Sequence, residues 1–212
     1  MPFVIHPSRG GRRLCLALAA LWLLAAPAVQ AAPGDSPARC ADQSFKQAFR
    51  SWNDRGSYTL LSSADMEGDL AGWALTGGAA PVAGNEPFHV GSPLDSRSLA
   101  LPTGSSATSA PICVGINYPF FRLFARNTGS SQIPLSVDVL YLNAGGHVMR
   151  TAPVGTLLGS SRWAPSRRIS LAIGRTGAGY GGEAAVAFRF TPGGTGGRWQ
   201  IDDIYVDPYA RR

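Results

Sequence analysis

Apolar and polar residues alternate in short runs along most of the chain after residue 57. In one run Leu135, Val137, Val139 and Tyr141 occupy alternate positions. Successive side chains of an extended strand point to opposite faces, so this spacing predicts strands with one buried face. Comparable runs occupy residues 98–101, 120–126, 148–151, 168–173 and 186–190.

Turn-forming residues separate these runs. Gly, Pro, Ser and Asn cluster between them, and Asn143–Gly146 is typical of a hairpin loop. Many short strands with regular punctuation favour an antiparallel β-sandwich or barrel over an α/β fold. No internal repeat or second-domain boundary is visible, so we expect one all-β domain over residues 58–212.

An aromatic stripe precedes the strands. Phe45, Phe49 and Trp52 are spaced i, i+4 and i+7, with Asp42 as a candidate N-cap. That spacing puts the three rings on one side of a helix, and it predicts a short helical segment that covers an end of the sandwich. The alternative interpretation is an aromatic platform for a sugar.

The last predicted strand changes phase in its middle. Trp199 and Ile201 share one face, whereas Ile204 and Val206 share the other. A β-bulge at Asp202–Asp203 would turn all four apolar side chains into the core. Two adjacent carboxylates at a bulge repel each other unless hydrogen-bond donors or a hard cation such as calcium hold them. The alternative is a pair of solvated acids at a strand end.

Two stretches resemble a known family of modules. The pattern W-x-I-D-D-I-x-V at residues 199–206 resembles the last strand of galactose-binding-like jelly-roll modules, which include many carbohydrate-binding modules. Such modules open with a strand that ends in Phe-Glu, followed shortly by Gly-Trp. Met66–Trp73 stands in that place here, with Met66 where Phe is usual. The resemblance implies a jelly-roll β-sandwich whose last strand lies beside its opening one.

A second resemblance covers residues from about 58 to 212. The stretches that carry it are residues 82–88, 95–99, 124–129 and the closing strand. They are similar to a family of secreted proteins from high-GC soil actinobacteria, to which no function is attached. This resemblance implies an exported protein but does not name a ligand.

The first resemblance also implies a structural calcium ion between the first and last strands. Carried over by position, Glu67 matches the acid of the first strand, and Asp203 or Asp202 matches that of the last. Asp65 and Asp95 are further candidates. The alternative is that these acids form partly buried ion pairs with two arginines, Arg97 and Arg198.

The first 31 residues have the organisation of an export signal. Three arginines precede an apolar stretch, Leu14–Ala26, that is too short to span a bilayer. Val29–Ala31 fits a signal-peptidase site, with cleavage after Ala31. We therefore expect a secreted, extracellular protein with a signal at residues 1–31, a leader at 32–57 and no membrane anchor after cleavage. Arg12–Arg13 fits the twin-arginine motif poorly, so the general export route is favoured.

Charge and cysteine content agree with export. The chain has 19 basic and 13 acidic residues, and removal of the three signal arginines leaves a net charge of only +3. This mild bias does not favour nucleic acid as a partner.

Cys15 leaves with the signal, so Cys40 and Cys113 remain as an even pair, which predicts one disulfide in an oxidising compartment. The sequence does not indicate an oligomeric state.

Catalytic motifs are weak. Residues 177–182 match G-x-G-x-x-G, but a dinucleotide fold needs a helix next, and residues 186–190 alternate as a strand. There is no G-x-S-x-G motif. His89 and His147 have no nucleophile or carboxylate placed beside them by sequence, and we expect both to be exposed or structural. Carboxylates that a glycosidase might pair are Glu67, Glu86, Asp95 and Glu183, at separations that sequence does not specify.

A binding function is favoured over catalysis. Sugar recognition needs aromatic faces flanked by polar groups, and such residues occur on predicted loops and strand ends. Trp73, Trp163 and Trp199 are expected in the core. The sequence therefore predicts a secreted, non-catalytic module that recognises a glycan or other extracellular polymer. A structural or adhesive cell-envelope protein is the alternative, and a polysaccharide-cleaving enzyme comes third. The candidate ligand-binding residues are Asn85, Glu86, Phe88, His89, Asn117, Tyr118, Phe120, Arg126 and Tyr180.

Overall fold

Two antiparallel β-sheets form the protein in the computed structural model, which describes residues 43–115, 119–171 and 183–209. These residues all belong to one unit, Gly34–Arg212. The predicted export signal, Cys40, Asn117, Tyr118, Tyr180 and the G-x-G-x-x-G stretch lie outside the described residues. Among the residues described, no helix is long and apolar enough to cross a membrane.

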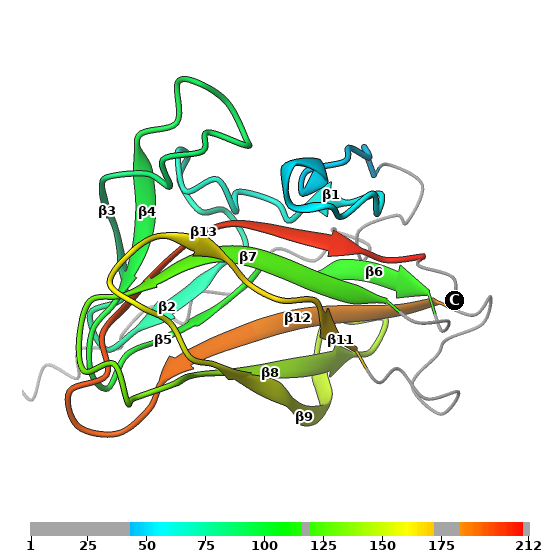
Figure 1. Cartoon of the computed structure of the whole chain (residues 1–212). Helices are drawn as coiled ribbons and strands as arrows, with labels where there is room; N and C mark the ends of the chain where they lie inside the picture. The colour runs from blue at the N-terminus through cyan, green and yellow to red at the C-terminus, as the bar shows by residue number, and fades with distance from the viewer. Residues whose placement is uncertain (1–42, 116–118, 172–182, 210–212) are drawn as a thin grey trace, which may run out of the picture. The chain divides into compact units, whose positions relative to one another are not determined.

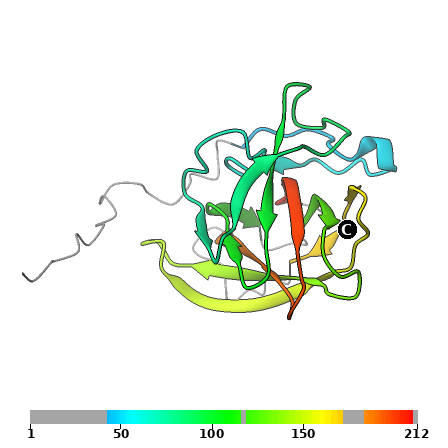
Figure 2. The same ribbon diagram turned by 90° about the vertical axis from the view of Figure 1, so that its left-hand side faces the viewer.

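The first sheet has seven strands and the second has six (Figure 1). The first runs in the order β10 (Ala164–Pro165), β7 (Phe120–Asn127), β13 (Trp199–Asp207), β4 (Arg97–Leu101) and β3 (Ala80–Ala83), with β1 (Thr59–Leu60) on β13 and β11 (Ile169–Ser170) on β7. The second runs in the order β2 (Ala74–Thr76), β5 (Ser106–Thr108), β12 (Glu183–Pro192), β8 (Leu135–Leu142) and β9 (Val148–Leu157), with β6 (Ile112–Gly115) on β12. The two sheets stack as layers, as Figure 2 shows from one end.

The core fills the space between the sheets. The alternating side chains of β8 and β12 point inward, and Phe188 of β12 meets Phe121 of β7 with ring centroids 4.8 Å apart. Burial of one such phenylalanine contributes about 1.5–3 kcal/mol. The predicted hairpin at Asn143–Gly146 is confirmed: β8 pairs with β9, and Gly146 N–H donates to the Asn143 carbonyl at 2.9 Å. The all-β sandwich predicted from alternation is therefore the observed fold.

The bulge predicted in the last strand is confirmed. The register of β13 against β7 shifts between Asp202 and Tyr205, and Asp203 has a φ of 47°. Trp199 and Ile201 before the shift and the apolar residues after it all lie in the core. The cause is burial, because an unbroken strand would turn the second apolar pair out to solvent.

The opening and closing strands lie side by side, as the jelly-roll resemblance implies. Thr59 pairs with Val206, and Leu60 with Tyr205. The opening strand is short, however, and Glu67 lies beyond it in a turn where Met66 has a φ of 59°. The turn begins with the Asp65 carboxylate, which accepts the Glu67 N–H at 3.4 Å, and side chains of this kind compete with strand pairing.

The N-terminal aromatic stripe forms less helix than its spacing predicts. The helical part is a three-residue 3-10 helix, η2 (Arg50–Trp52), which ends at Asn53 in the left-handed region. Before it, Lys46 forms an isolated bridge with Tyr58. This segment lies over β13 and β7, on a face of the sandwich instead of an end (Figure 1). Burial of its rings on the sheet outweighs helix propensity.

Cys113 is buried in β6, at the predicted end of the disulfide. Since Cys40 lies outside the described residues, their pairing stays a prediction.

Candidate functional site

The outer face of the first sheet carries an unusual number of aromatic and basic side chains. On β7, Phe121 and Leu123 enter the core, so Phe120, Phe124 and Arg126 fall on the opposite face. The N-terminal segment, which carries Phe49, Trp52 and Tyr58, covers one part of this face, and Phe124 is fully buried there. Arg126 lies at the uncovered end and is partly exposed.

Two aromatic groups remain partly exposed beside the covered part. Trp52 lies 5.1 Å from Phe88 and 5.4 Å from Phe124, measured between ring centroids. Phe88, on the loop between β3 and β4, is 44% exposed. On the other side Trp163, next to β10, lies under the Arg126 guanidinium at 5.1 Å. These rings therefore offer apolar faces at the surface and are held in place from below.

Strand register places a pair of polar side chains, Arg126 and Gln200, beside Trp163 on this face. Arg126 and Gln200 are directly opposite each other on β7 and β13, and Arg126 Nε donates to Gln200 Oε1 at 2.6 Å. The pairing of Ala164 with Ala125 brings Trp163 to the other side of Arg126. We call Trp52, Phe88, Arg126, Trp163 and Gln200 the aromatic face.

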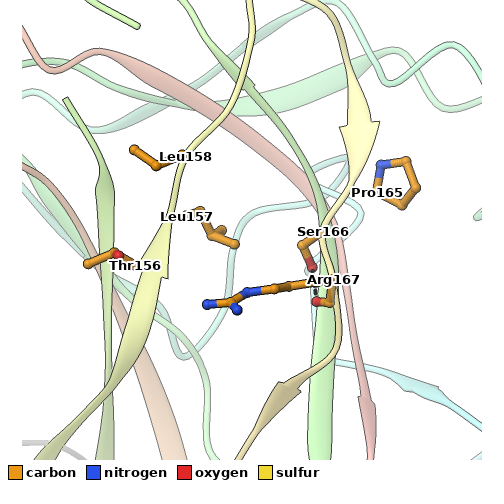
Figure 3. Close-up of a pocket in the computed structure, with 6 residues that line it drawn as sticks. All are labelled: Thr156, Leu157, Leu158, Pro165, Ser166 and Arg167. Carbon is orange, nitrogen blue, oxygen red and sulfur yellow. Dashed lines mark hydrogen bonds between the residues drawn. The ribbon is translucent and has the colours of Figure 1, made fainter. Parts of the chain in front are cut away.

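One cavity borders the aromatic face, and two more lie along the edge between β9 and the β10 segment. One of about 210 Å³ lies beside Gln200 and is lined by Ala80, Ala100 and Arg198 among others. A second, of about 450 Å³, lies between the end of β9 and the β10 segment (Figure 3). A third of about 60 Å³ shares Leu157, Leu158, Pro165 and Ser166 with the second and shares Trp199 with the first.

The structure brings together only some of the predicted ligand-binding residues. Phe88 and Arg126 belong to the aromatic face, and Asn85 and His89 lie on the same loop as Phe88. His89 is exposed, as is His147, in agreement with the prediction for both. Glu86 is fully buried, so it is not a surface contact.

Phe120 packs in the covered part of the face. It lies 5.6 Å from Tyr58 and 4.7 Å below the Arg168 guanidinium. Trp163 was expected in the core but lies on the outer face, because residue 163 precedes a two-residue strand at the sheet edge. Trp199 is in the core as predicted. Trp73 is partly buried and packs against the core, and its Nε1 donates to the Ser62 carbonyl at 2.8 Å.

Three buried acids meet at the β13 bulge. Glu86 accepts the backbone N–H groups of Phe88 and Val90, the latter at 2.7 Å. Asp202 accepts the N–H groups of Asp203 at 2.9 Å and of Glu86 at 3.1 Å. Burial raises the pKa of Asp202 to about 9. Burial, followed by the charge of Glu86, raises the pKa of Asp203 to about 7. The acids thus fix the β3–β4 loop, and with it Phe88, on the sheet.

The residues at the bulge provide a partial fit for calcium. Asp203 Oδ2 accepts the Gly91 N–H at 2.9 Å, whereas Oδ1 is buried and has no hydrogen-bond partner among the described residues. A Cβ atom at Gly91 would clash with Asp95 Oδ2 and lie 2.9 Å from Asp203 Oδ1, so both oxygens border one small space. Carboxylate oxygens in such a space suit a hard cation.

Glu67, the third predicted ligand, is engaged elsewhere. Its Oε1 accepts the backbone N–H groups of Ser96 and Arg97, each at 2.6 Å. Within the described ranges, no group of three or more His, Cys, Asp or Glu side chains is placed to hold a metal. Arg97 and Arg198 form no ion pair there either, so the alternative of ion-paired acids is wrong for the residues described. Calcium stays a prediction, with Asp203 and Asp95 as the carboxylates open to it.

Ionic contacts hold the N-terminal segment on the sheet. Asp54 is buried and pairs with Arg122 at 2.8 Å and with Arg168. Tyr58 donates its hydroxyl to Asp54 at 2.6 Å, and Arg122 lies 4.2 Å above the ring of Phe49. Burial alone would raise the pKa of Asp54, but the hydrogen bonds from Arg168, Tyr58, Gly56 and Arg122 hold it well below its usual range.

Comparisons with known proteins give fold likeness without a family. No protein-family model matches the sequence, and no curated protein matches it. Similar solved structures include the enzymatically active domain of tailspike protein 4 of bacteriophage CBA120, at 16% identity and a TM-score of 0.45 over 68% of this chain and 20% of that one. The CBM22-1–GH10 modules of Clostridium thermocellum xylanase 10B with xylohexaose match at 14% identity and a TM-score of 0.48, over 70% of this chain and 28% of that one.

A carbohydrate-binding module gives a third match. TmCBM61 in complex with β-1,4-galactotriose is 14% identical, with a TM-score of 0.39, over 72% of this chain and 97% of that one. The present chain spans only 20% of the tailspike chain and 28% of the xylanase chain. At this identity and these TM-scores the likeness carries no function to this chain, and the resemblance to secreted actinobacterial proteins stays a prediction.

The described linings of the cavities hold no pair of carboxylates. A glycosidase places two carboxyl groups about 5–10 Å apart in a cleft open to substrate. Glu86, Asp202 and Asp203 at the bulge are buried, and the described linings of the first three cavities include no acidic residue. A fourth cavity of about 400 Å³, between Phe45 and Tyr209, has one acid, Asp207, in its described lining.

Proposed function

We propose that this chain is a secreted, non-catalytic module that binds a glycan through its aromatic face. The observation that carries the proposal is that the exposed ring of Phe88 and the partly exposed rings of Trp52 and Trp163 lie with the polar pair Arg126 and Gln200 on one sheet surface. Sugar rings present an apolar side to aromatic faces and hydroxyl groups to polar side chains, so this composition suits them.

The surface is rigid before any ligand arrives. Trp52 and Phe88 pack on buried Phe124, and the loop that carries Phe88 is fixed by the backbone hydrogen bonds to Glu86. Preorganised side chains lose little conformational entropy on binding, which favours recognition by a small number of contacts. A calcium ion at Asp203 and Asp95 belongs to the same proposal, in which its charge would neutralise the acids beneath this loop.

Binding to a panel of soluble plant and bacterial polysaccharides tests the proposal. Phe88→Ala and Trp163→Ala should each weaken binding about tenfold, because each removes one ring face. Phe45→Ala is the matched control: Phe45 is 47% exposed, but its ring neighbour is Tyr209, away from the aromatic face. Affinity electrophoresis gives the dissociation constants. Wild-type affinity in both variants, or loss of affinity in Phe45→Ala as well, would rule out this face as the site.

A further inference from the structure

Two arginines at the aromatic face, Arg126 and Arg198, have no ion-pair partner among the described residues. Arg126 lies over the Trp163 ring and bonds Gln200, which lines the same cavity as Arg198. Arg162 and Arg167 line the two cavities along the edge between β9 and the β10 segment and are likewise without an ion pair there. The ion pairs of the described residues use only Arg122, Arg168 and Arg189.

The acids that adjoin the aromatic face are buried beneath its Phe88 loop. Asp54 and Asp138 neutralise the three paired arginines. The acids at the β13 bulge are buried, and Glu183 bonds the Tyr209 hydroxyl near the fourth cavity. Among the described residues, none that lines the three cavities is acidic. The described lining of these cavities therefore carries positive charge only, although the molecule as a whole is only mildly basic.

The side-chain geometry leaves guanidinium groups open to a ligand. Arg126 uses Nε for Gln200 and makes no hydrogen bond through its Nη atoms to the described residues. The guanidinium lies 5.1 Å from the centre of the Trp163 ring, and its two Nη atoms can meet a carboxylate with two parallel hydrogen bonds. Arg167 extends its guanidinium across the cavity between β9 and the β10 segment (Figure 3).

We propose that the ligand is an anionic glycan, one that carries carboxylate or sulfate groups along its chain. This inference rests on the proposed glycan-binding function and specifies its substrate class. Unpaired like charges at one surface repel each other, and a polyanion relieves that repulsion when it binds. The rings would hold the sugar faces, while Arg126 and the arginines of the cavities would hold successive acidic groups.

Binding to four polymers at several salt concentrations tests the inference. Polygalacturonate carries carboxylates, dextran sulfate carries sulfates, and arabinoxylan of low uronate content is the neutral comparison; duplex DNA tests for plain charge attraction. The purified chain should prefer one of the two anionic polysaccharides by tenfold or more over arabinoxylan and DNA, and its affinity should fall steadily as salt rises. Arg126→Gln/Arg198→Gln should lose at least tenfold in affinity for that polysaccharide.

A charge-matched double variant separates site from net charge. Arg55→Gln/Arg150→Gln removes two exposed arginines that line none of the three cavities, and it should bind like the wild type. Equal binding of DNA, or equal loss in both double variants, would overturn the inference. Salt-independent binding of arabinoxylan, unchanged in Arg126→Gln/Arg198→Gln, would overturn it and leave the proposed glycan-binding function standing. Failure to bind any polysaccharide would overturn both.

Discussion

Individual buried residues hold the N-terminal segment on the outer face of the first sheet. Asp54 is the clearest case, because one carboxylate receives Arg122, Arg168 and the Tyr58 hydroxyl, and so joins the N-terminal segment to β7 and to the chain before β11. The sequence did not single out Asp54, since its partners are 4 to 114 positions away. Such a contact depends on the tertiary fold and has no local signature.

Removal of this charge should unfold the protein more readily. Asp54→Asn leaves buried Arg122 without its counter-ion, so we expect the free energy of unfolding to drop by about 3 kcal/mol. Asp138→Asn is the control, because the Asp138–Arg189 pair is partly exposed and should contribute less than about 1 kcal/mol. Urea denaturation of both variants measures the difference. Equal losses of unfolding free energy in the two variants would show that Asp54 does not hold the N-terminal segment on the sheet.

The same residue predicts the response to acid. The pKa of Asp54 is lower in the folded protein than in the unfolded chain, so its contribution is complete above about pH 4 and is lost as the pH falls towards its folded value. Wild-type protein should therefore lose more stability than Asp54→Asn between about pH 5 and about pH 2. Urea midpoints across this range give the two slopes. Parallel slopes would contradict the role given to Asp54.

The sequence indicates surface positions where loops and alternation determine exposure. Phe88 lies on a loop and Arg126 on the polar phase of a strand, so both were candidates and both are at least partly exposed. Trp163 and Gln200 were not among the candidates, and Trp52 appeared only in the alternative interpretation of the aromatic stripe. Trp163 reaches the surface only because Ala164 pairs with Ala125, and Gln200 matters only because it lies opposite Arg126. These are facts of register between distant strands, which the sequence does not show.

At the scale of elements, β13 was the most predictable and the N-terminal segment the least. The phase change around Asp202–Asp203 required a bulge, because both apolar pairs had to reach one core, and the structure has it. The stripe of Phe45, Phe49 and Trp52 forms only one helical turn, because Phe49 is buried against the sheet and Trp52 packs beside it, while Phe45 stays exposed. The position of Glu67 beyond the opening strand has a similar cause in local turn chemistry.

The bulge also predicts a response to calcium. If calcium binds between Asp203 and Asp95, the melting temperature of the wild type should rise with millimolar calcium and return on addition of EDTA. Asp203→Asn should show no such response, yet should fold, because asparagine tolerates the positive φ of residue 203. Asp69→Asn, at an exposed turn acid, is the control and should respond like the wild type. A wild type insensitive to calcium would remove the ion from the proposal.

At the scale of the molecule, the fold places its charges and rings unevenly. The buried acids collect under the β3–β4 loop, and most of the apolar rings pack in the core or under the N-terminal segment. Arg126 bonds Gln200, and Arg198 lines the cavity beside it, whereas Arg162 and Arg167 line cavities along the edge between β9 and the β10 segment. The sequence showed only scattered arginines with a mild net charge, so the proposed binding surface became visible only in three dimensions.

The tryptophan indole signals test glycan binding at the aromatic face most directly. A ¹⁵N NMR titration with an oligosaccharide of the class selected in the binding panel reports each indole N–H separately. We expect the signals of Trp52 and Trp163 to shift with ligand, while that of Trp73, bonded to the Ser62 carbonyl, stays in place. A shift confined to Trp73, or saturable binding with no shift at Trp52 and Trp163, would contradict glycan binding at the aromatic face.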